Sequence, residues 1–345
     1  MKVLAYIGKM KMWTLMLATI SISMTSCDAI LDEEDVDCSI EYRVDFKYDN
    51  NMKFADAFAN EVTSVVLYAF DEDGKFVYQR TEEGDVLAAD DYNMLVEVQP
   101  GDYDLVAWAK GKGDETFSIP ILTEGVSTIE ELNCKMDRIY SRAADGTAEV
   151  HSDLRPLFHG QVQRQSFSRA ATTQVATVRL TKNTNNIRIV LQHLSGEAVD
   201  VDNFTFTIED ENGFMNYDNK LLDDEPLTYY AWHTDSGTAE MDESGARTTT
   251  SVSVAVAELT VGRLVMENKP ILTITNKEGE KVLSIPLIDY ALLVKGYYNR
   301  EMTDQEYLDR QDEYNMTFFL DENDQWASSS IIINSWKVVL DNVDL

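Results

Sequence analysis

Apolar and polar residues alternate without interruption over residues 38–48. The apolar positions are Cys38, Ile40, Tyr42, Val44, Phe46 and Tyr48, and every residue between them is polar or charged. Because successive side chains of a strand point to opposite faces, this pattern predicts a β-strand with one buried face. The same period of two dominates most of the chain that follows, so we predict an all-β protein.

Turn-forming residues separate the predicted strands. Residues 62–70 are apolar on both faces, as in a central strand, and an acidic turn ending in Gly74 leads to residues 76–80 as a hairpin. A second hairpin is predicted where residues 92–98 and 103–109 flank Pro100-Gly101. Further strands are predicted at residues 175–181, 187–191, 204–208, 252–259, 271–275, 282–285, 314–320 and 331–340.

Helical spacing is confined to short insertions. Phe54, Phe58 and Val62 recur every four residues, which favours one short helix. Thr303 and Glu306 have the spacing of a capping box, so residues 303–310 are predicted as a surface helix in an insertion.

The length of the chain indicates two domains. About 310 residues remain after a signal peptide is removed, more than one hydrophobic core usually supports. The polar stretch 182–186, which lies between two strand-like segments, is interpreted as a turn and as the boundary. We therefore expect two tandem β-sandwiches, at residues 38–182 and 183–345.

The N-terminal residues have the layout of a secretory signal. Lys2, Lys9 and Lys11 form a basic start, and a mostly apolar run at 12–24 leads to small polar Thr25 and Ser26. The apolar run is too short to span a bilayer, which needs about 20 residues. Residues 1–26 are therefore predicted to be removed as a signal peptide.

Cys27 follows the signal directly and resembles the modified cysteine of a bacterial lipoprotein. Met24-Thr25-Ser26-Cys27 is similar to a lipobox, although Met24 stands where leucine is usual. The alternative is an ordinary cysteine in a signal-peptide flank. If Cys27 carries acyl chains, each buried CH₂ contributes about 0.8 kcal/mol, so several chains attach the protein to the membrane permanently.

An acidic stretch follows the cysteine. Residues 27–37 contain six acidic side chains and no aromatic one, so we interpret them as a solvated tether. The stretch resembles the acidic export signal of surface lipoproteins of Bacteroidetes, whereas Asp28 by itself would indicate retention in the inner membrane under the enteric rule. Without residues 1–26 the chain has 26 basic and 61 acidic side chains, a formal charge of −35. Such a charge disfavours nucleic acid as a partner.

Cys38 and Cys134 are the other two cysteines. An even pair in an oxidising compartment can form a disulfide, here one that closes a loop of about 97 residues worth roughly 4 to 5 kcal/mol. Two separate buried thiols are the alternative.

No motif indicates catalysis, a cofactor or a metal. The four histidines have no metal-binding spacing, and neither a nucleophile elbow nor a phosphate-binding glycine loop is present. Acidic turns such as 71–73, 223–225 and 321–324 lack EF-hand spacing and are read as solvated hairpin tips rather than calcium sites. Tyr229, Tyr230 and Trp232 suit either the core or stacking on a sugar. No enzyme and no small-molecule substrate is predicted.

Several stretches together resemble the FimB/Mfa-type fimbrial anchor subunits of Bacteroidetes. They are CSIEYRVDFKYDNNMKFADAFANEVTSVVLYAFDEDGKFVYQ, PGDYDLVAWAKG, LFHGQV, TVRLTKNTNNIRIVL and IIINSWKVVL. The resemblance implies two transthyretin-like Greek-key sandwich domains, export as an outer-membrane lipoprotein, and a place in a surface fimbria assembled by strand exchange. Its implied partners are a fimbrial stalk subunit and, through the N-terminal lipid, the outer membrane.

Two further expectations concern the anchor role. Stalk subunits of this kind are similar to precursors trimmed after an arginine, but residues 27–40 contain no Arg or Lys, and Arg43 lies inside a predicted strand. The lipid and the first strand are therefore expected to stay, so the subunit tethers a polymer and limits its length. Ile332, Trp336, Val338 and Leu340 share one phase of a predicted strand and are the candidate stalk contact, or else simply a last core strand.

A second function class shares the anchor and the tether. A surface glycan-binding lipoprotein of a nutrient-uptake system would have the same β-sandwiches, with Tyr230 and Trp232 as candidate sugar contacts.

Overall fold

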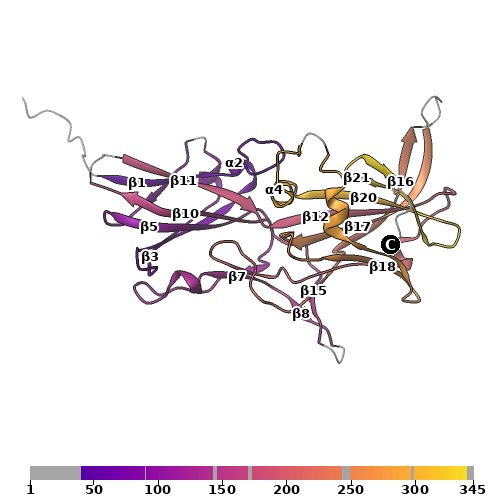
Figure 1. Ribbon diagram of the computed structural model, residues 1–345, viewed down its shortest axis with the longest axis horizontal. Coiled ribbons are helices and arrows are strands. Elements are labelled where there is room, and N and C mark those ends of the chain that lie inside the picture. The colour runs from indigo at the N-terminus through magenta and orange to yellow at the C-terminus, as the bar shows by residue number, and fades with distance from the viewer. Residues whose placement is uncertain are drawn as a thin grey trace, which may run out of the picture. The chain divides into compact units, whose positions relative to one another are not determined.

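The structure is a computed structural model that describes residues 40–89, 91–142, 146–169, 173–242, 249–296 and 299–339. All the elements below lie in one compact unit, Glu41–Leu345. Strands make up most of its regular structure, as Figure 1 shows, which confirms the all-β prediction. The short helices are α2 (Phe58–Glu61), α3 (Leu287–Leu292) and α4 (Asp304–Arg310), and the 3₁₀ turns are η1 (Asp85–Ala88), η2 (Ile129–Glu131) and η3 (Val201–Asn203).

The first half of this unit is built on one seven-stranded sheet. In spatial order its strands are β3 (Phe76–Glu83), β2 (Ser64–Phe70), β5 (Gly101–Lys110), β10 (Leu157–Phe167), β11 (Thr173–Lys182), β1 (Glu41–Lys47) and β4 (Met94–Val96). β1 pairs in parallel with β11 and antiparallel with β4. Tyr42, Val44 and Phe46 are buried and the residues between them are half-buried, so the alternation did predict this strand.

The seven-stranded sheet curls until its two edges meet. The Tyr78 hydroxyl of β3 donates to the carbonyl of Leu95 in β4 at 3.3 Å, and Arg80 lies 3.7 Å from Glu97. A bulge in β10 allows the bend: Arg164 has a φ of 53°, and its N–H donates to the Asp104 carboxylate at 2.8 Å. The two edges are thus tied by side chains.

The predicted hairpin around Pro100-Gly101 is wrong. β4 pairs with β1, whereas β5 pairs with β2 and β10. Alternation identified both strands but carries no information about partners, and here the chain crosses the curled sheet between them. The hairpin of β2 with β3 is confirmed, with Gly74 of its turn at a φ of 74°.

The second half contains two six-stranded sheets that share one core. We call the first the C-terminal sheet and the second the facing sheet; Ile189 and Phe318 of the former pack in one cluster with Phe206 and Leu272 of the latter. The C-terminal sheet has the order β16 (His233–Asp242), β17 (Thr249–Gly262), β12 (Thr184–His193), β20 (Glu313–Leu320), β21 (Trp326–Ile333) and β22 (Trp336–Val339). The facing sheet has the order β19 (Lys281–Pro286), β18 (Ile271–Asn276), β13 (Phe204–Asp210), β15 (Leu227–Tyr230), β9 (Ala148–Val150) and β8 (Ile139–Tyr140).

Strands that precede residue 182 cross into the second half. β8 and β9 belong to the facing sheet, and a small sheet joins β14 (Phe214–Asn216), β7 (Asn133–Met136) and β6 (Phe117–Ser118). The almost buried Arg138 fixes this crossing segment, because its guanidinium donates to the Gly213 carbonyl at 3.2 Å and lies 2.7 Å from Asp224. A division into independent domains at residue 182 stays a prediction, and the sheets themselves interleave in sequence.

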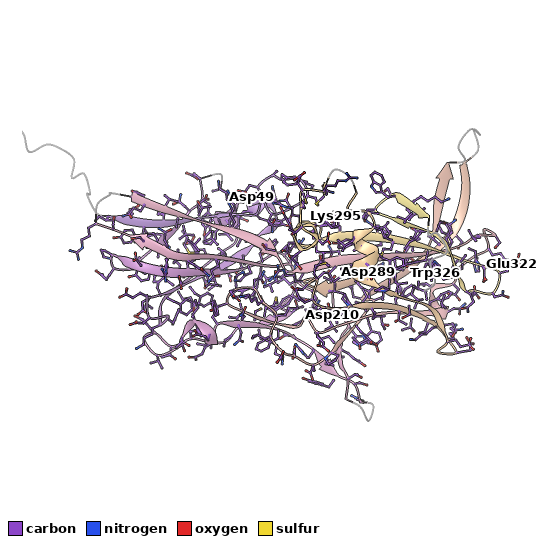
Figure 2. The ribbon with its side chains drawn as sticks, in the orientation of Figure 1. Asp49, Asp210, Asp289, Lys295, Glu322 and Trp326 are labelled. Carbon is purple, nitrogen blue, oxygen red and sulfur yellow. The ribbon has the colours of Figure 1, made fainter. Side chains whose placement is uncertain are left out.

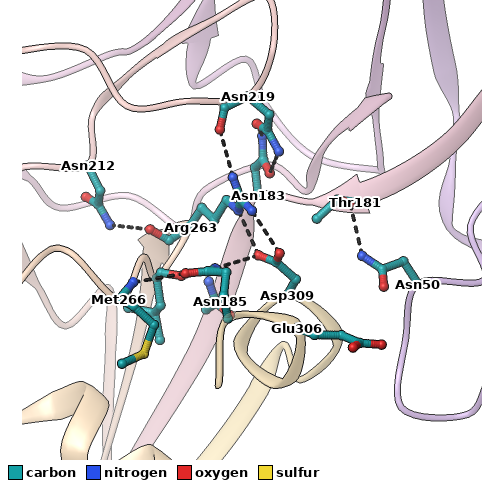
Figure 3. A network of polar contacts seen from close by, with 12 residues as sticks. Asn50, Thr181, Asn183, Asn185, Asn212, Asn219, Arg263, Met266, Glu306 and Asp309 are labelled. Carbon is teal, nitrogen blue, oxygen red and sulfur yellow. Dashed lines mark hydrogen bonds and ion pairs between the residues drawn. The ribbon is translucent and has the colours of Figure 1, made fainter. Parts of the chain in front are cut away.

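The polar stretch 182–186 is strand rather than turn. β11 ends at Lys182 and β12 begins at Thr184, so only Asn183 separates them. The side-chain amides of Asn183 and Asn219 exchange hydrogen bonds of 2.6 and 3.1 Å, and the Asn185 amide donates to the Gly262 carbonyl at 3.2 Å. Figure 3 shows Asn183, Asn185 and Asn219 in this polar network. Buried amides that are hydrogen-bonded are compatible with a strand, which is why polarity misled the turn prediction.

Helix α4 joins the two halves. Its N-cap is Thr303, whose hydroxyl accepts the N–H of Glu306 at 3.0 Å, so the predicted cap and helix are confirmed. The helix is not simply a surface insertion, because Tyr307 and Leu308 are buried. Asp309 forms a two-point pair with Arg263 at 2.8 Å, and Arg310 reaches the first half.

Arg310 contacts a strained loop next to α2. Its guanidinium donates to the carbonyls of Asp49 and Asn51 at 3.1 and 3.4 Å and lies 4.7 Å from the ring of Phe54. Phe54 has a φ of 52° and stands outside α2, so the predicted helix is shorter than its spacing suggested. Nearby, Lys182 pairs with Glu61 at 3.4 Å within the first half and with Asp312 of the second half at 2.6 Å.

Replacing Arg310 should loosen this junction. Arg310→Ala removes two carbonyl hydrogen bonds and a cation–π contact, and we expect the free energy of unfolding to fall by about 2 kcal/mol. Arg188, which is half-exposed and 3.9 Å from Glu258, provides a matched control expected to cost under about 0.5 kcal/mol. Denaturant unfolding of both variants measures the difference, and equal losses would contradict the role of Arg310.

Asp210 should make stability depend on pH. Burial raises the pKa of this carboxyl, labelled in Figure 2, to about 6, against hydrogen bonds from Asn268 and Glu211 that lower it. The folded state therefore binds more protons between about pH 4 and 6, so stability falls as the pH rises through that window. Asp210→Asn should gain about 1 to 2 kcal/mol over the native chain at pH 7 and nothing at pH 4, measured by denaturant unfolding; a gain that is independent of pH would contradict this.

Candidate functional site

The first strand lies inside its sheet and not on an edge. β1 forms seven residue pairs with β11 and three with β4. Arg43, the first basic residue after the predicted signal peptide, lies 2.9 Å from Glu41 and donates to the Asn93 side chain at 2.8 Å. Its peptide bonds are therefore part of a strand that is paired on both sides.

The cysteines are placed only in part. Cys27 and Cys38 lie outside the described residues. Cys134 of β7 is a buried, free cysteine, and burial raises the pKa of its thiol to about 12. It packs in a cluster that extends from Tyr68 and Trp108 of the first half into the core of the second half. Because Cys38 is not described, both alternatives for this pair, a disulfide and two separate buried thiols, stay predictions.

The C-terminal segment is two strands and not the predicted one. Asn334 and Ser335 have φ values of 47° and 71°, typical of the tight turn that joins hairpin strands, and they separate β21 from β22. Ile332 pairs with Lys337, whereas Trp336 and Val338 pair with Ile333 and Ile331. A two-residue turn reverses the phase of the alternation, so Ile332 faces away from Trp336 and Val338.

One strand of this hairpin contributes to the core, and the other forms the edge of the sheet. Ile331 and Ile333 of β21 are fully buried, and Val338 is half-buried against the same core. Trp336 is 64% exposed at the start of β22, the outermost strand of the C-terminal sheet. Leu340, the fourth residue of the predicted contact, lies outside the described residues.

The three aromatic residues before β16 have different environments. Tyr229 is fully buried and its hydroxyl donates to Asn212, so it belongs to the core. Tyr230 stacks on His151 with ring centroids 4.3 Å apart. Trp232 is exposed and borders a pocket of about 290 Å³ on the C-terminal sheet. A second pocket of about 430 Å³ continues along the sheet and shares Arg188, Glu258 and Asn315 with the first.

We call these two adjoining pockets the Trp232 trough. Its floor includes Val190, Val254 and Val256, and its polar lining includes Arg188 and Asn315. The acidic lining residues are Asp153, Asp235, Glu258 and Glu313. With one arginine against four carboxylates, the trough disfavours anionic ligands.

The remaining titratable residues serve local structure. His159 is buried beside Trp108, and burial lowers the pKa of its imidazole to about 4. In the acidic turns, carboxylates accept backbone N–H groups: Asp71 from Asp73 and Lys75, and Asp321 from Asn323 and Gln325. Within the ranges that the structure describes, no three metal-ligating side chains come together. In the same ranges no helix is long and apolar enough to cross a membrane.

Comparison with known proteins gives a consistent result. The model of a family described as fimbrillin-A associated anchor proteins Mfa1 and Mfa2 matches residues 34–342. A search of curated proteins found no match.

Solved structures also resemble the chain. A candidate adhesin from Bacteroides thetaiotaomicron is 32% identical, with a TM-score of 0.75 over 88% of this chain and 98% of that one. A candidate polysaccharide-binding protein from the same organism is 31% identical, with a TM-score of 0.73 over 88% and 99%. The fimbrial anchor protein Mfa2 of Porphyromonas gingivalis is 18% identical, with a TM-score of 0.61 over 88% and 99%, and therefore shares the fold.

The match to the family covers nearly the whole chain, and the resemblance stated from the sequence is confirmed. The chain belongs to the family of fimbrillin-A associated anchor proteins Mfa1 and Mfa2.

Proposed function

We propose that the chain is a cell-surface lipoprotein that anchors a fimbria to the outer membrane, limits its length, and meets the stalk by β-strand addition. It has no catalytic role in this proposal. The observation that carries it is the position of β1, which follows the tether directly and is paired on both sides. Membership of a fimbrial anchor family supports the same assignment.

Retention of β1 is what makes an anchor of this subunit. No basic residue occurs in residues 27–40, and Arg43 lies within a doubly paired strand where a protease active site has no access to its backbone. The acylated residue therefore stays joined to the fold. The tether from Cys27 to Glu41 can span at most about 50 Å, which keeps the fold close to the lipid.

A strand that stays in its sheet also leaves no vacancy there for a neighbouring subunit. The stalk must then contact another part of the chain, and unpaired sheet edges are the natural templates for strand addition. The C-terminal sheet ends in β16 on one side and β22 on the other. A polymer that reaches such an edge can be held without being extended past β1, which accounts for a limit on length.

Changing Cys27 tests the anchor function. In cells that express Cys27→Ala, we expect labelling of the chain with fatty acid to disappear and cell-bound filaments to be shed, because the attachment depends on acyl chains at this residue. Palmitate labelling and electron microscopy of the cell surface are the measurements. Cys38→Ala is the control and should keep both label and filaments. Filaments that remain cell-bound on Cys27→Ala cells would contradict the proposal.

Glycan binding is a second candidate function, favoured by the Trp232 trough. An exposed indole beside amide and carboxylate side chains can stack on a pyranose ring and bond its hydroxyl groups. A similar protein of B. thetaiotaomicron is described as a candidate polysaccharide-binding protein. The acidic lining favours neutral over sialylated or sulfated sugars.

A glycan array with neutral and acidic members tests this candidate. We expect binding to neutral glycans that falls at least about tenfold in Trp232→Ala, equivalent to about 1.4 kcal/mol of stacking. Trp336→Ala removes another exposed tryptophan outside the trough and should leave binding unchanged. Absence of binding to every neutral glycan, or an equal loss in both variants, would exclude the trough as a sugar site.

A further inference from the structure

The four sheets differ in how open their edges are. β3 and β4, the edges of the seven-stranded sheet, are tied to each other through Tyr78 and Leu95. β22 has four residues and β8 has two. β19 ends at Pro286, which leads directly into α3. β22 and β8 therefore offer only short rows of backbone groups to an incoming strand, and the row of β19 ends at a proline.

β16 is different in length and exposure. It has ten residues, and within the described part of the chain only β17 pairs with it. Residues 232–236 are all exposed, including those whose side chains point toward the facing sheet, and Gly237 is half-buried. An edge strand presents backbone N–H and C=O groups on its outer side to an incoming strand. At Ser236 two polar groups already have partners, because its N–H donates to the Asp235 carboxylate at 2.8 Å and its hydroxyl accepts the Val201 N–H at 3.4 Å.

The hairpin of β16 and β17 also continues beyond its sheet. β12 pairs with β17 only from Ala255 to Gly262, whereas β16 pairs with β17 as far as the pair of Asp242 with Thr249. From Gly237 and Val254 onward the hairpin is therefore a ribbon of two strands, and Figure 1 shows it rising past the other strands. An isolated two-stranded ribbon is marginally stable in water, so a third strand would stabilise it.

The ribbon lies far along the fold from the start of β1. β1 begins at Glu41, and β11 runs beside it in the same direction from Thr173 to Lys182. After Asn183 the chain continues into β12, and the ribbon extends past the end of the β12–β17 pairing at Leu191. Glu41 and the ribbon are thus separated by the lengths of two consecutive ten-residue strands.

We propose that β16 is the edge at which a single extended segment of the fimbrial stalk subunit adds as a third strand. This inference rests on the proposed anchor function and names the contact within it. The segment is about eight to ten residues long, to match β16, and carries uncharged or basic side chains, because β16 contains Asp235, Glu240 and Asp242 and no basic residue other than His233. β22 is the competing edge.

Proline substitution tests the edge directly. Backbone N–H groups of successive strand residues point to opposite sides, so one of Ser236→Pro and Gly237→Pro removes an outward donor and the other breaks the ladder with β17. Lys337→Pro and Val338→Pro are the matched pair on β22. All four are made in the full-length chain, and each is scored for thermal unfolding, amount at the cell surface, and filaments per cell by electron microscopy.

For the β16 variant that keeps its melting temperature and surface amount, we expect at least a tenfold drop in cell-bound filaments, with the folded β22 variant unaffected. Folded β16 variants that retain filaments would overturn the inference, and so would shedding that is confined to β22 variants. Those results would overturn only the assignment to β16, and the proposed anchor function would stand with strand addition at another edge. If a strain without the chain holds its filaments normally, the anchor function itself fails.

Hydrogen exchange decides the case in which both β16 variants unfold. Anchor and attached filament stubs are extracted together from the producing cells, and amide exchange is compared with that of the free chain. Slower exchange in residues 233–242 on attachment supports the inference. Unchanged exchange there, or slowing at residues 336–339 instead, overturns it.

Discussion

The pairing of β1 on both of its sides is the interaction on which the rest depends. β1 is the first strand of the described residues, and in our proposal a lipid holds the chain ahead of it. Any load applied there reaches the fold through the ladder of β1 with β11 and its shorter ladder with β4. A pull along β1 acts on all of its pairs with β11 together. The same pairing fills the place that a neighbouring subunit's strand would need, which makes this chain an end of a polymer in our account.

The load then has a continuous path to the second half. β11 continues into β12 through Asn183 alone, and the buried amide pair of Asn183 with Asn219 fixes that point. Arg310 and Lys182 hold the halves together from either side of it. Each half starts with a strand that pairs in parallel with a later one, β1 with β11 and β12 with β20.

The sequence predicted the positions of elements that have a buried face or a local cap, and missed contacts between residues far apart in the chain. Alternation located β1, and a capping pattern located α4, because both signals are local. The junction role of Arg310 was not predictable, since its contacts lie more than 250 residues away in sequence. β16 was missed because HTDSGTAEMD has no apolar face, and its residues 233–236 are all exposed. The two-residue turn at Asn334 split a strand whose period seemed unbroken, and so misplaced Ile332 relative to Trp336.

The central claim is that the lipid and the first strand remain on the mature chain. Mass spectrometry of the chain, isolated from the surface of cells that carry filaments, tests this most directly. Our account predicts a single mature form whose first residue is an acylated Cys27 and which includes the whole of β1. A form that begins after Arg43, or an unmodified residue 27, would contradict it.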